Sequence, residues 1–236
     1  NYSRALSDDV LRKAMINTAY YALWQVPMQT GLALVLALLV KKSFSGISIF
    51  RIGYYLPVVI PMVVASVLWR IMLDSHNGLV NSILKAIGLS AQPLLSSPTQ
   101  ALPVLAGALS WQWVGFAMLI FLAGLQDIPY SYYEAATVDG ANWLQSFWYI
   151  TLPLLRRPAV YVIVTNTINA LKLFTPIYII TKGGPQNSTI TMMYYIFREA
   201  FTYGHLGYAS AIAVIFTFIL IIFAALQLRI LRSDEE

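Results

Sequence analysis

The chain has 236 residues, of which 58% are apolar and 11% are charged, whereas soluble domains carry about 25% charged residues. So few polar residues cannot cover a soluble core of this size, which excludes an ordinary soluble enzyme, a disordered protein and a nucleic-acid-binding module. The net charge of +5 therefore indicates basic loops beside a membrane. Cysteine is absent, which excludes disulfides and thiol chemistry, and the two histidines argue against a His-rich metal site.

Five stretches are long and apolar enough to cross a bilayer, which requires about 20 mostly apolar residues. The predicted fold class is therefore all-α, a polytopic integral membrane helical bundle that forms a single transmembrane domain over 1–236. Prolines are expected to kink the first two spans, at Pro27, Pro57 and Pro61. The five spans are predicted at about 14–40, 52–73, 101–126, 158–181 and 206–230.

Basic residues set the predicted orientation of these spans. Lys41, Lys42 and Arg51 crowd one short loop, and the positive-inside rule places such a loop in the cytoplasm. Basic residues are equally numerous on the opposite side, so the prediction depends on this crowding alone. Alternation then places the loop 127–157 and the C-terminus in the cytoplasm and Asn1 outside. The expected location is the plasma (inner) membrane, with several passes through it.

The predicted cytoplasmic loop 127–157 carries the most specific local pattern. Ser131 and Glu134 have the spacing of a capping box, so a helix is expected to begin near 132. Gly140 is placed to end that helix in a left-handed conformation. A role as a helix cap alone is the simplest alternative for Glu134.

A second short helix is expected to follow the first. Asn142 and Gln145 repeat the cap spacing, and Pro153 interrupts the helix that they begin. In the first helix, Ala135 and Ala136 form a small-residue face, which can fit closely into a groove on another protein. The loop is therefore predicted to contain two short helices on the inner face of the membrane.

A spaced set of residues in this loop points to a protein family. E-A-A at 134–136 is followed by Asp139-Gly140 and by I-T-L-P at 150–153. This set resembles the cytoplasmic loop of ABC importer permeases, in particular the maltose- and glycerol-phosphate-type first subunit of the carbohydrate-uptake branch. The resemblance extends over nearly the whole chain, with further matches at Asn17-Thr18, 181–185 and 207–211.

The resemblance implies a transport function. The chain would be the permease subunit of an ATP-driven, binding-protein-dependent importer, which moves a sugar or sugar-like solute by alternating access. In the family, a coupling helix in this loop docks into a separate ATPase. The ATPase-coupling residues implied by the motif are Glu134, Ala135, Ala136, Asp139 and Gly140.

The resemblance also implies partners and a further span. The expected partners are a second permease subunit in a heterodimer, a cytoplasmic ATPase dimer, an extracytoplasmic solute-binding protein and the lipid bilayer, with no nucleic acid. The long loops 75–100 and 183–205 are the candidates for docking the solute-binding protein. Family members commonly have six spans, and the segment from Asn1 to Leu6 matches the one that follows the first of them. One N-terminal span is therefore expected before the sequence given.

The sequence carries no motif for catalysis. A phosphate-binding loop requires G-x-x-x-x-G-K-[ST], and Gly183 and Gly184 follow a lysine instead of preceding one. The chain is therefore not expected to be an enzyme or to bind a metal or cofactor, and ATP and Mg²⁺ are assigned to the partner ATPase. The alternatives are an ABC permease for another small solute such as phosphate or an amino acid, a subunit of an ion-gradient secondary transporter, and a membrane scaffold.

Polar and aromatic residues within the predicted spans mark a candidate solute path. Thr165, Asn169 and Lys172 recur at helical spacing and would form one polar stripe. A lysine at bilayer depth normally faces a bundle interior or an aqueous cavity, although snorkelling to the outer interface is the alternative for Lys172. The third span offers aromatic faces beside an amide, a combination that suits sugars and equally suits an interfacial aromatic belt. The predicted substrate-pathway residues are Trp111, Gln112, Thr165, Asn169, Lys172 and Phe174.

Overall fold

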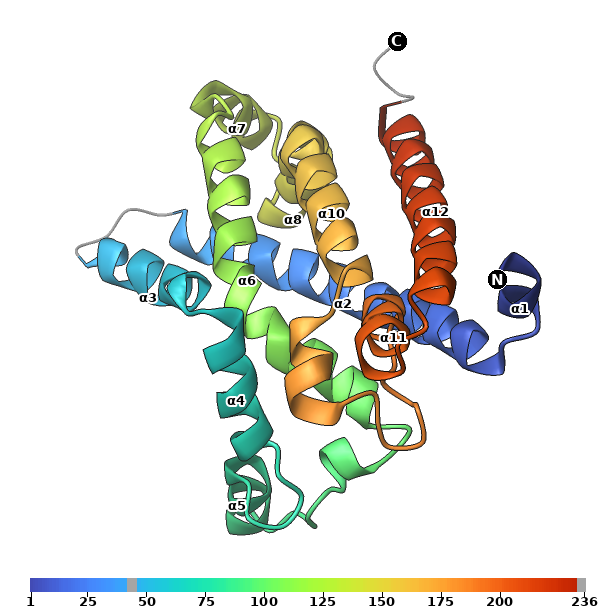
Figure 1. Cartoon of the computed structure of the whole chain (residues 1–236). Helices are drawn as coiled ribbons and strands as arrows, with labels where there is room; N and C mark the ends of the chain where they lie inside the picture. Colours follow the sequence, from blue (N-terminus) through green and yellow to red (C-terminus); the bar gives the residue numbers. More distant parts are fainter. Residues whose placement is uncertain (42–45, 233–236) are drawn as a thin grey trace. The chain divides into compact units, whose positions relative to one another are not determined.

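A computed structural model describes residues 1–41 and 46–232, and all regular elements in these ranges are helices (Figure 1). This confirms the predicted all-α class, whereas Lys42 lies outside the described residues. The α-helices are α1 (Tyr2–Leu6), α2 (Asp9–Val40), α3 (Ile47–Val59), α4 (Met62–Met72), α5 (Leu79–Ala86), α6 (Ala101–Gln126), α7 (Tyr130–Val138), α8 (Trp143–Ser146), α9 (Leu152–Leu154), α10 (Arg156–Leu171), α11 (Met192–Phe197) and α12 (Leu206–Arg232). The short turns are the 3-10 helix η1 (Leu94–Ser96) and the π-helices η2 (Phe147–Thr151), η3 (Ile177–Thr181) and η4 (Arg198–Thr202).

Within the described ranges, three helices are long and apolar enough to cross a membrane: α2, α6 and the part of α12 up to Gln227. The first of them begins earlier than the predicted span, at Asp9. The reason is a side-chain cap, because Asp8 Oδ1 accepts hydrogen bonds from the backbone N–H groups of Val10 and Leu11 at 2.9 and 3.0 Å. An aspartate in this position satisfies N–H groups that the first helical turn leaves unpaired.

The other two predicted spans are interrupted, so the expectation of five spans is not confirmed. The range 52–73 contains α3 and α4, which qualify as a span only as a broken pair. Pro61 separates them, since proline lacks the N–H that a continuous helix needs. In the range 158–181, α10 ends at Leu171 and η3 follows. Pro176 cannot donate to the carbonyl four residues earlier, and a new turn begins there.

The chain divides into two compact units, and each draws on separated segments. The first unit comprises Asn1–Val26, Ile60–Leu109 and Thr167–Glu236, and the second comprises Pro27–Val59 and Ser110–Asn166. α2, α6 and α10 each contribute residues to both units. The single transmembrane domain expected over the whole chain stays a prediction.

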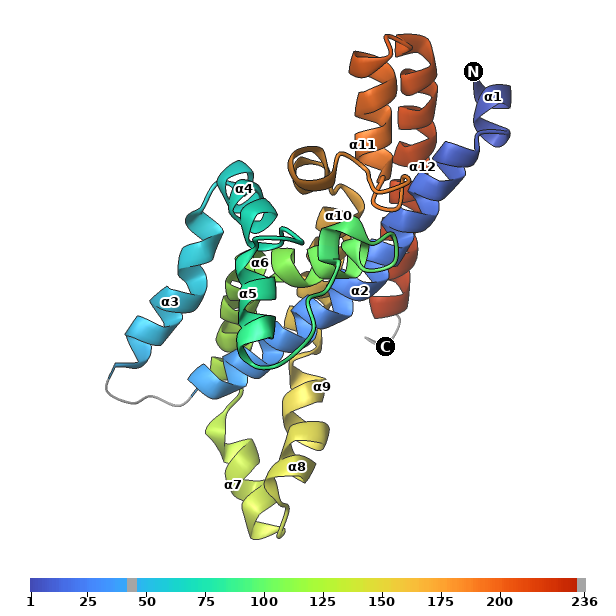
Figure 2. The same cartoon turned by 90° about the horizontal axis from the view of Figure 1, so that it is seen from below.

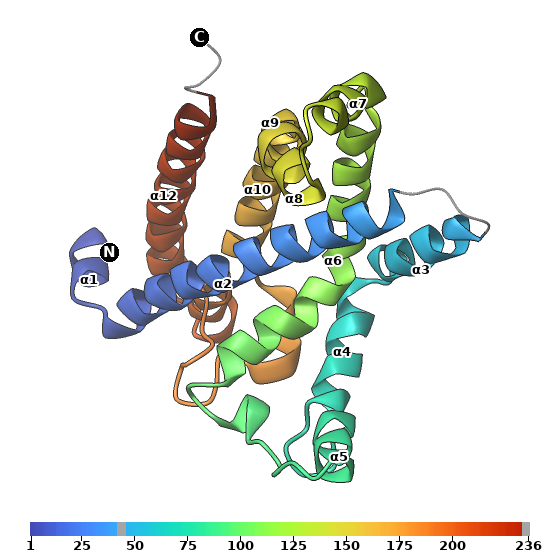
Figure 3. The same ribbon diagram turned by 180° about the vertical axis from the view of Figure 1, so that it is seen from behind.

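The second unit has an apolar core formed by the later part of α2, by α6 and by α10. Ala33 and Ala37 of α2 are fully buried, and such small side chains allow helices to approach closely. Gly124 of α6 serves the same purpose, since an added Cβ would lie 2.5 Å from Cγ of Pro158. α7 follows the end of α6, and α8 and α9 lead back to α10 (Figure 3).

The first unit contains two local assemblies. In one of them, α11 and α12 lie side by side, as Figure 2 shows. In the other, the loop after α4 is held by the fully buried amide of Asn81. Its Nδ2 donates to the carbonyls of Ser75 and Gln92 at 2.9 and 2.8 Å. This loop therefore has a defined conformation that is held by hydrogen bonds.

Candidate functional site

The loop between α6 and α10 begins with α7, whose C-terminus is closed by backbone hydrogen bonds. Gly140 has φ +79°, as predicted, and the structure confirms it as the left-handed residue that ends the helix. The N–H of Ala141 donates to the carbonyl of Ala136 at 2.8 Å, and the N–H of Gly140 donates to that of Thr137 at 3.1 Å. This pair of bonds is the Schellman motif. Glycine is favoured here because other residues resist a positive φ.

The N-termini of the two short helices differ from each other. The capping box predicted for Ser131 is wrong, because α7 already begins at Tyr130, with Pro129 as the N-cap residue and no side-chain cap. Proline holds the extended conformation from which a helix can start, so no side-chain acceptor is needed to position the chain. The second box is confirmed: Asn142 Oδ1 accepts from the N–H of Gln145 at 2.9 Å, and Gln145 Oε1 accepts from the N–H of Asn142 at 2.7 Å.

The hairpin of α7 and α8 (Figure 2) is anchored at its base. The hydroxyl groups of Tyr133 and Thr151 are hydrogen-bonded at 2.9 Å, and the Thr151 side chain is buried. Lys41, just beyond the end of α2, donates to the Tyr133 hydroxyl at 3.3 Å and lies 4.3 Å from the centre of its ring. These contacts fix α7 to both α2 and η2.

Several apolar side chains in the segment from α7 to η2 are exposed. The exposed fractions of Val138, Trp143 and Tyr149 are 87%, 72% and 81%. These exposed side chains offer apolar surface to a binding partner. Of the predicted coupling residues, Glu134, Ala135, Asp139 and Gly140 are exposed and Ala136 is half-buried.

The predicted substrate-pathway residues are divided between the two units. Trp111, Gln112 and Thr165 belong to the second unit, and Asn169, Lys172 and Phe174 belong to the first. In α6, Trp111 is partly exposed and borders an apolar pocket of about 340 Å³ beside Tyr54 and Pro57 of α3. Its neighbour Gln112 is buried.

The polar stripe expected on the fourth span ends at the C-terminus of α10. Lys172 lies one residue beyond the end of α10, and its backbone N–H donates to the carbonyl of Ile168 at 3.1 Å. Its side chain is exposed, at a helix C-terminus where a positive charge is favourable. The Thr165 hydroxyl donates to the carbonyl of Tyr161 at 2.8 Å, within its own helix.

Phe174 belongs to an aromatic cluster in the first unit. Its ring centre lies 5.7 Å from that of Tyr178 and 5.1 Å from that of Phe197. The segment T-K-G-G-P at 181–185, which begins at the last residue of η3, is also ordered by a side chain. The Thr189 hydroxyl donates to the carbonyl of Gly184 at 2.7 Å and lies 2.7 Å from the Thr181 hydroxyl.

Two polar networks were not identified from the sequence. In the second unit, Gln29 Nε2 donates to Asn166 Oδ1 at 3.1 Å, and Asn166 Nδ2 donates to the Thr30 hydroxyl at 3.3 Å. Gln29 and Asn166 are buried. Gln29 within an apolar span could have indicated this network, because a buried amide needs hydrogen-bond partners.

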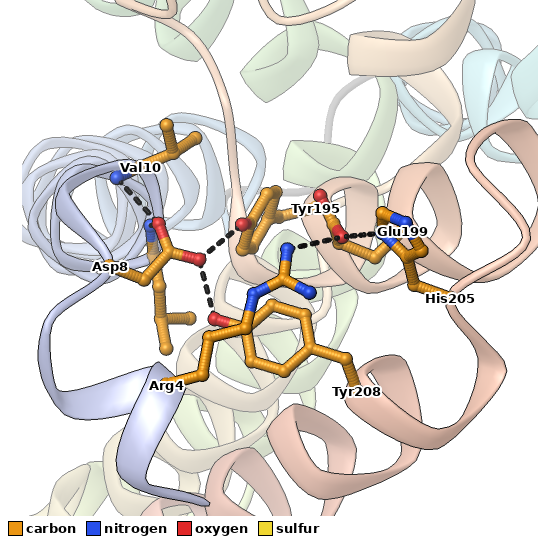
Figure 4. Close-up of polar contacts among 8 residues, drawn as sticks. Arg4, Asp8, Val10, Tyr195, Glu199, His205 and Tyr208 are labelled. Carbon is orange, nitrogen blue, oxygen red and sulfur yellow. Dashed lines mark hydrogen bonds and ion pairs between the residues drawn. The ribbon is translucent and has the colours of Figure 1, made fainter. Parts of the chain in front are cut away.

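The second network surrounds Asp8 in the first unit (Figure 4). Asp8 Oδ2 accepts hydrogen bonds from the hydroxyls of Tyr195 and Tyr208, each at 2.5 Å. Burial acts to raise the pKa of Asp8, but these two bonds and two from backbone N–H groups outweigh it and lower the pKa. Burial and the hydrogen bond to Asp8 raise the pKa of Tyr195.

Glu199 lies beside this network and is itself buried (Figure 4). Its Oε2 lies 2.9 Å from Nδ1 of His205 and 3.6 Å from Nη2 of Arg4. The guanidinium of Arg4 also stacks on the ring of Tyr208, at 4.0 Å from its centre. Together these contacts join α1, α11, η4 and the start of α12.

The family model for the inner membrane component of binding-protein-dependent transport systems matches residues 8–233. YesP, a probable ABC transporter permease of Bacillus subtilis (strain 168), is 43% identical over 200 residues, which are 83% of this chain and 64% of YesP. LacF, the lactose transport system permease of Rhizobium radiobacter, is 34% identical over 243 residues, which cover this chain and 80% of LacF.

A solved structure has the same fold. A bacterial ABC transporter involved in the import of the acidic polysaccharide alginate aligns with all of this chain and 83% of its own, with a TM-score of 0.89 and 22% identity. The matched relatives are permeases, which are transport components rather than enzymes. Because the family model covers almost the whole sequence, this chain belongs to the inner membrane components of binding-protein-dependent transport systems.

Proposed function

We propose that the chain is the permease subunit of an ATP-driven importer for a sugar or sugar-like solute. The hairpin of α7 and α8 carries this proposal, since it exposes apolar side chains such as Val138 and Trp143 and is anchored through Tyr133 and Thr151. The lactose permease relative, at 34% identity, supports a sugar as the solute. The family description itself supports a solute-binding protein as a partner.

The coupling step follows from the anchoring of this hairpin. Glu134, Ala135, Ala136, Asp139 and Gly140 form the surface that docks into the cytoplasmic ATPase. The hydrogen bonds of Tyr133 pass a movement of α7 to α2 and η2. The close contact between Gly124 and Pro158 passes it to α6 and α10. ATP-driven closure of the ATPase thus moves these helices between inward-open and outward-open states.

The solute path uses aromatic and amide side chains. Aromatic rings stack on the apolar faces of sugars, while amide and hydroxyl groups bond the sugar hydroxyls. The pocket of about 340 Å³ beside Trp111 has the size of a small ligand site. The residues assigned to the path are Trp111, Gln112, Thr165, Asn169, Lys172 and Phe174.

The remaining subunits supply the energy and the solute. A second, different permease completes the membrane part, and an ATPase dimer binds ATP and Mg²⁺, so this chain binds no cofactor itself. The loops 75–100 and 183–205 face a solute-binding protein outside the membrane. The C-terminus and the hairpin of α7 and α8 lie in the cytoplasm.

Single-cysteine crosslinking tests this arrangement, because the chain has no native cysteine. Val138→Cys, at the tip of α7, should crosslink to the ATPase in the assembled transporter. Leu79→Cys is a matched control on α5, since Leu79 is 52% exposed but lies in an outer loop of the proposed topology. Crosslinking of the ATPase through Leu79→Cys and not through Val138→Cys would overturn the proposal.

A further inference from the structure

Two of the motif matches, at Asn17-Thr18 and 181–185, have no role in the proposed function, and both belong to the first unit. The asparagine of the first match reaches the loop 182–191, which joins η3 to α11. Its Nδ2 donates to two backbone carbonyls of this loop, those of Asn187 and Ile190, each at 3.0 Å. One amide group of α2 therefore holds the loop at two points.

Two neighbours of Asn17 on α2 hold the same part of the chain. Lys13, one helical turn earlier, donates from Nζ to the carbonyl of Gln186 at 2.7 Å. Thr18 is buried, and its hydroxyl accepts from the N–H of Met192, at the start of α11, at 2.9 Å. Residues four positions apart share one face of a helix. The first part of α2 therefore presents a row of polar side chains to the loop.

The loop has a backbone conformation that depends on such contacts. Lys182, Gln186 and Asn187 have φ values of +51°, +51° and +57°. A positive φ is uncommon for residues other than glycine, and it persists only where the surrounding structure determines it. Lys13 and Asn17 bind the carbonyls of two of these three residues. The side chains of α2 thus contribute directly to the shape of the loop.

The loop has an exposed part and a buried part. Residues 188–192 are buried, whereas Lys182 and Gln186 are exposed. A protein that docks on this loop therefore meets the part that has the unusual backbone conformation. A loop that is already fixed before docking loses less conformational entropy on association, so its fixation increases the affinity for the partner.

We propose that the segment 182–187 is a docking surface for the solute-binding protein and that Asn17 is its positioning residue. The identity of the partner rests on the proposed function, which places the loop 183–205 against the solute-binding protein. The positioning role rests on the hydrogen bonds between α2 and the loop. Asn17 acts through the loop, whose backbone it holds in the conformation that the partner meets.

The test measures binding of the purified solute-binding protein of the same transporter to the complete transporter in lipid nanodiscs. Asn17→Asp keeps the size of the side chain but replaces the donor with an acceptor, which repels both carbonyls of the loop. It should weaken binding by about tenfold, because association must then also order the loop. The rate of ATP hydrolysis at a saturating concentration of the solute-binding protein should stay at the wild-type value, whereas a general folding defect would lower it.

Asn1→Asp is the matched control for this variant. Asn1 is exposed at the N-cap of α1, a position where aspartate is as favourable as asparagine. The control therefore adds the same charge to the first unit and leaves the contacts between α2 and the loop intact. It should bind as the wild type does. Wild-type affinity in Asn17→Asp, equal weakening in Asn1→Asp, or a lower saturated rate at unchanged affinity would each overturn the inference.

If Asn17→Asp does not assemble, Lys13→Met decides the result. Lys13 is exposed, and its replacement removes the hydrogen bond to Gln186, which should weaken binding by about threefold. Arg12→Met is the control for it, because Arg12 is exposed one position earlier and pairs with Asp9 at 3.3 Å instead of with the loop. Equal affinities of Lys13→Met and Arg12→Met would overturn the inference.

Crosslinking through single cysteines locates the docking surface. Gln186→Cys should crosslink to the solute-binding protein in the complete transporter. Leu6→Cys should not, since Leu6 is 92% exposed in the first unit but lies outside the loop. Crosslinking through Leu6→Cys and not through Gln186→Cys would overturn the assignment of the surface.

ATP hydrolysis separates this inference from the proposed function. Stimulation of hydrolysis by the solute-binding protein, with wild-type affinity in Asn17→Asp, would overturn the positioning role alone. Binding that Asn17→Asp weakens, without any stimulation of hydrolysis, would overturn the proposed function and support the positioning role. Absence of binding to the wild-type transporter would overturn both.

Discussion

Replacing Gly140 with leucine should uncouple ATP hydrolysis from transport while the protein still assembles in the membrane. Gly140 has φ +79°, and an added Cβ would meet no atom within 4 Å. The replacement therefore causes no clash within the chain, and its left-handed backbone costs about 1–2 kcal/mol of folding stability. In the proposed docking site, however, the new side chain would overpack the interface by about 1–3 kcal/mol, or about 5- to 150-fold in docking affinity.

The assay measures solute uptake and ATP hydrolysis in proteoliposomes that contain the complete transporter. Gly88→Leu is the matched control, because Gly88 has φ +81° and its Cβ would also meet no atom within 4 Å. Both variants carry the same backbone strain, but Gly88 follows α5, far along the chain from the hairpin of α7 and α8. Only Gly140→Leu should lose uptake. Uptake at the wild-type rate in Gly140→Leu, or equal losses in both variants, would refute the reasoning.

Three further predictions concern stability and the solute path. Gly124→Ala should lower the melting temperature, because its methyl group would lie 2.5 Å from Pro158 Cγ and overpacking costs about 1–3 kcal/mol; an unchanged melting temperature would contradict the close approach. Burial acts to raise the folded-state pKa of Asp8, but hydrogen bonds lower it. The Asp8 carboxylate therefore stabilises the fold above its usual pKa of about 4, and this stabilisation is lost as the pH falls through the lower folded-state pKa. Thermal unfolding at pH 7 and pH 3 should show a smaller loss in Asp8→Asn than in the wild type, and equal losses would argue against this role. Lys172→Ala should change the KM or the solute preference of uptake, and normal uptake by a normally assembled variant would rule out a pathway role.

Local sequence chemistry predicted several features of the coupling hairpin. The left-handed Gly140 and the box formed by Asn142 and Gln145 depend only on neighbouring residues, and both were predicted correctly. The box expected at Ser131 failed because Pro129 fixes the start of α7 by itself. Pro129 and Ser131 lie in the same turn and each could mark the start of α7, and rules based on neighbouring residues do not decide between them.

Apolar composition located the long helices but not their interruptions. Pro61 and Pro176 were visible in the sequence, yet membrane helices often accommodate a proline without breaking. Whether a proline bends or ends a helix depends on which neighbours satisfy the freed carbonyl groups. The sequence does not contain that information.

The network around Asp8 was beyond sequence analysis for a different reason. Asp8 and its tyrosine partners are separated by 187 and 200 positions. Only the tertiary fold brings these three residues together.

The double role of Asp8 also has a consequence for biosynthesis. One of its oxygens caps α2, while the other is held by tyrosines of α11 and α12. Tyr195 and Tyr208 follow Asp8 by 187 and 200 positions, so the ribosome adds both partners only after most of the chain has been made. The contacts of Asp8 with α11 and α12 therefore form late in synthesis, after α2 itself has been made.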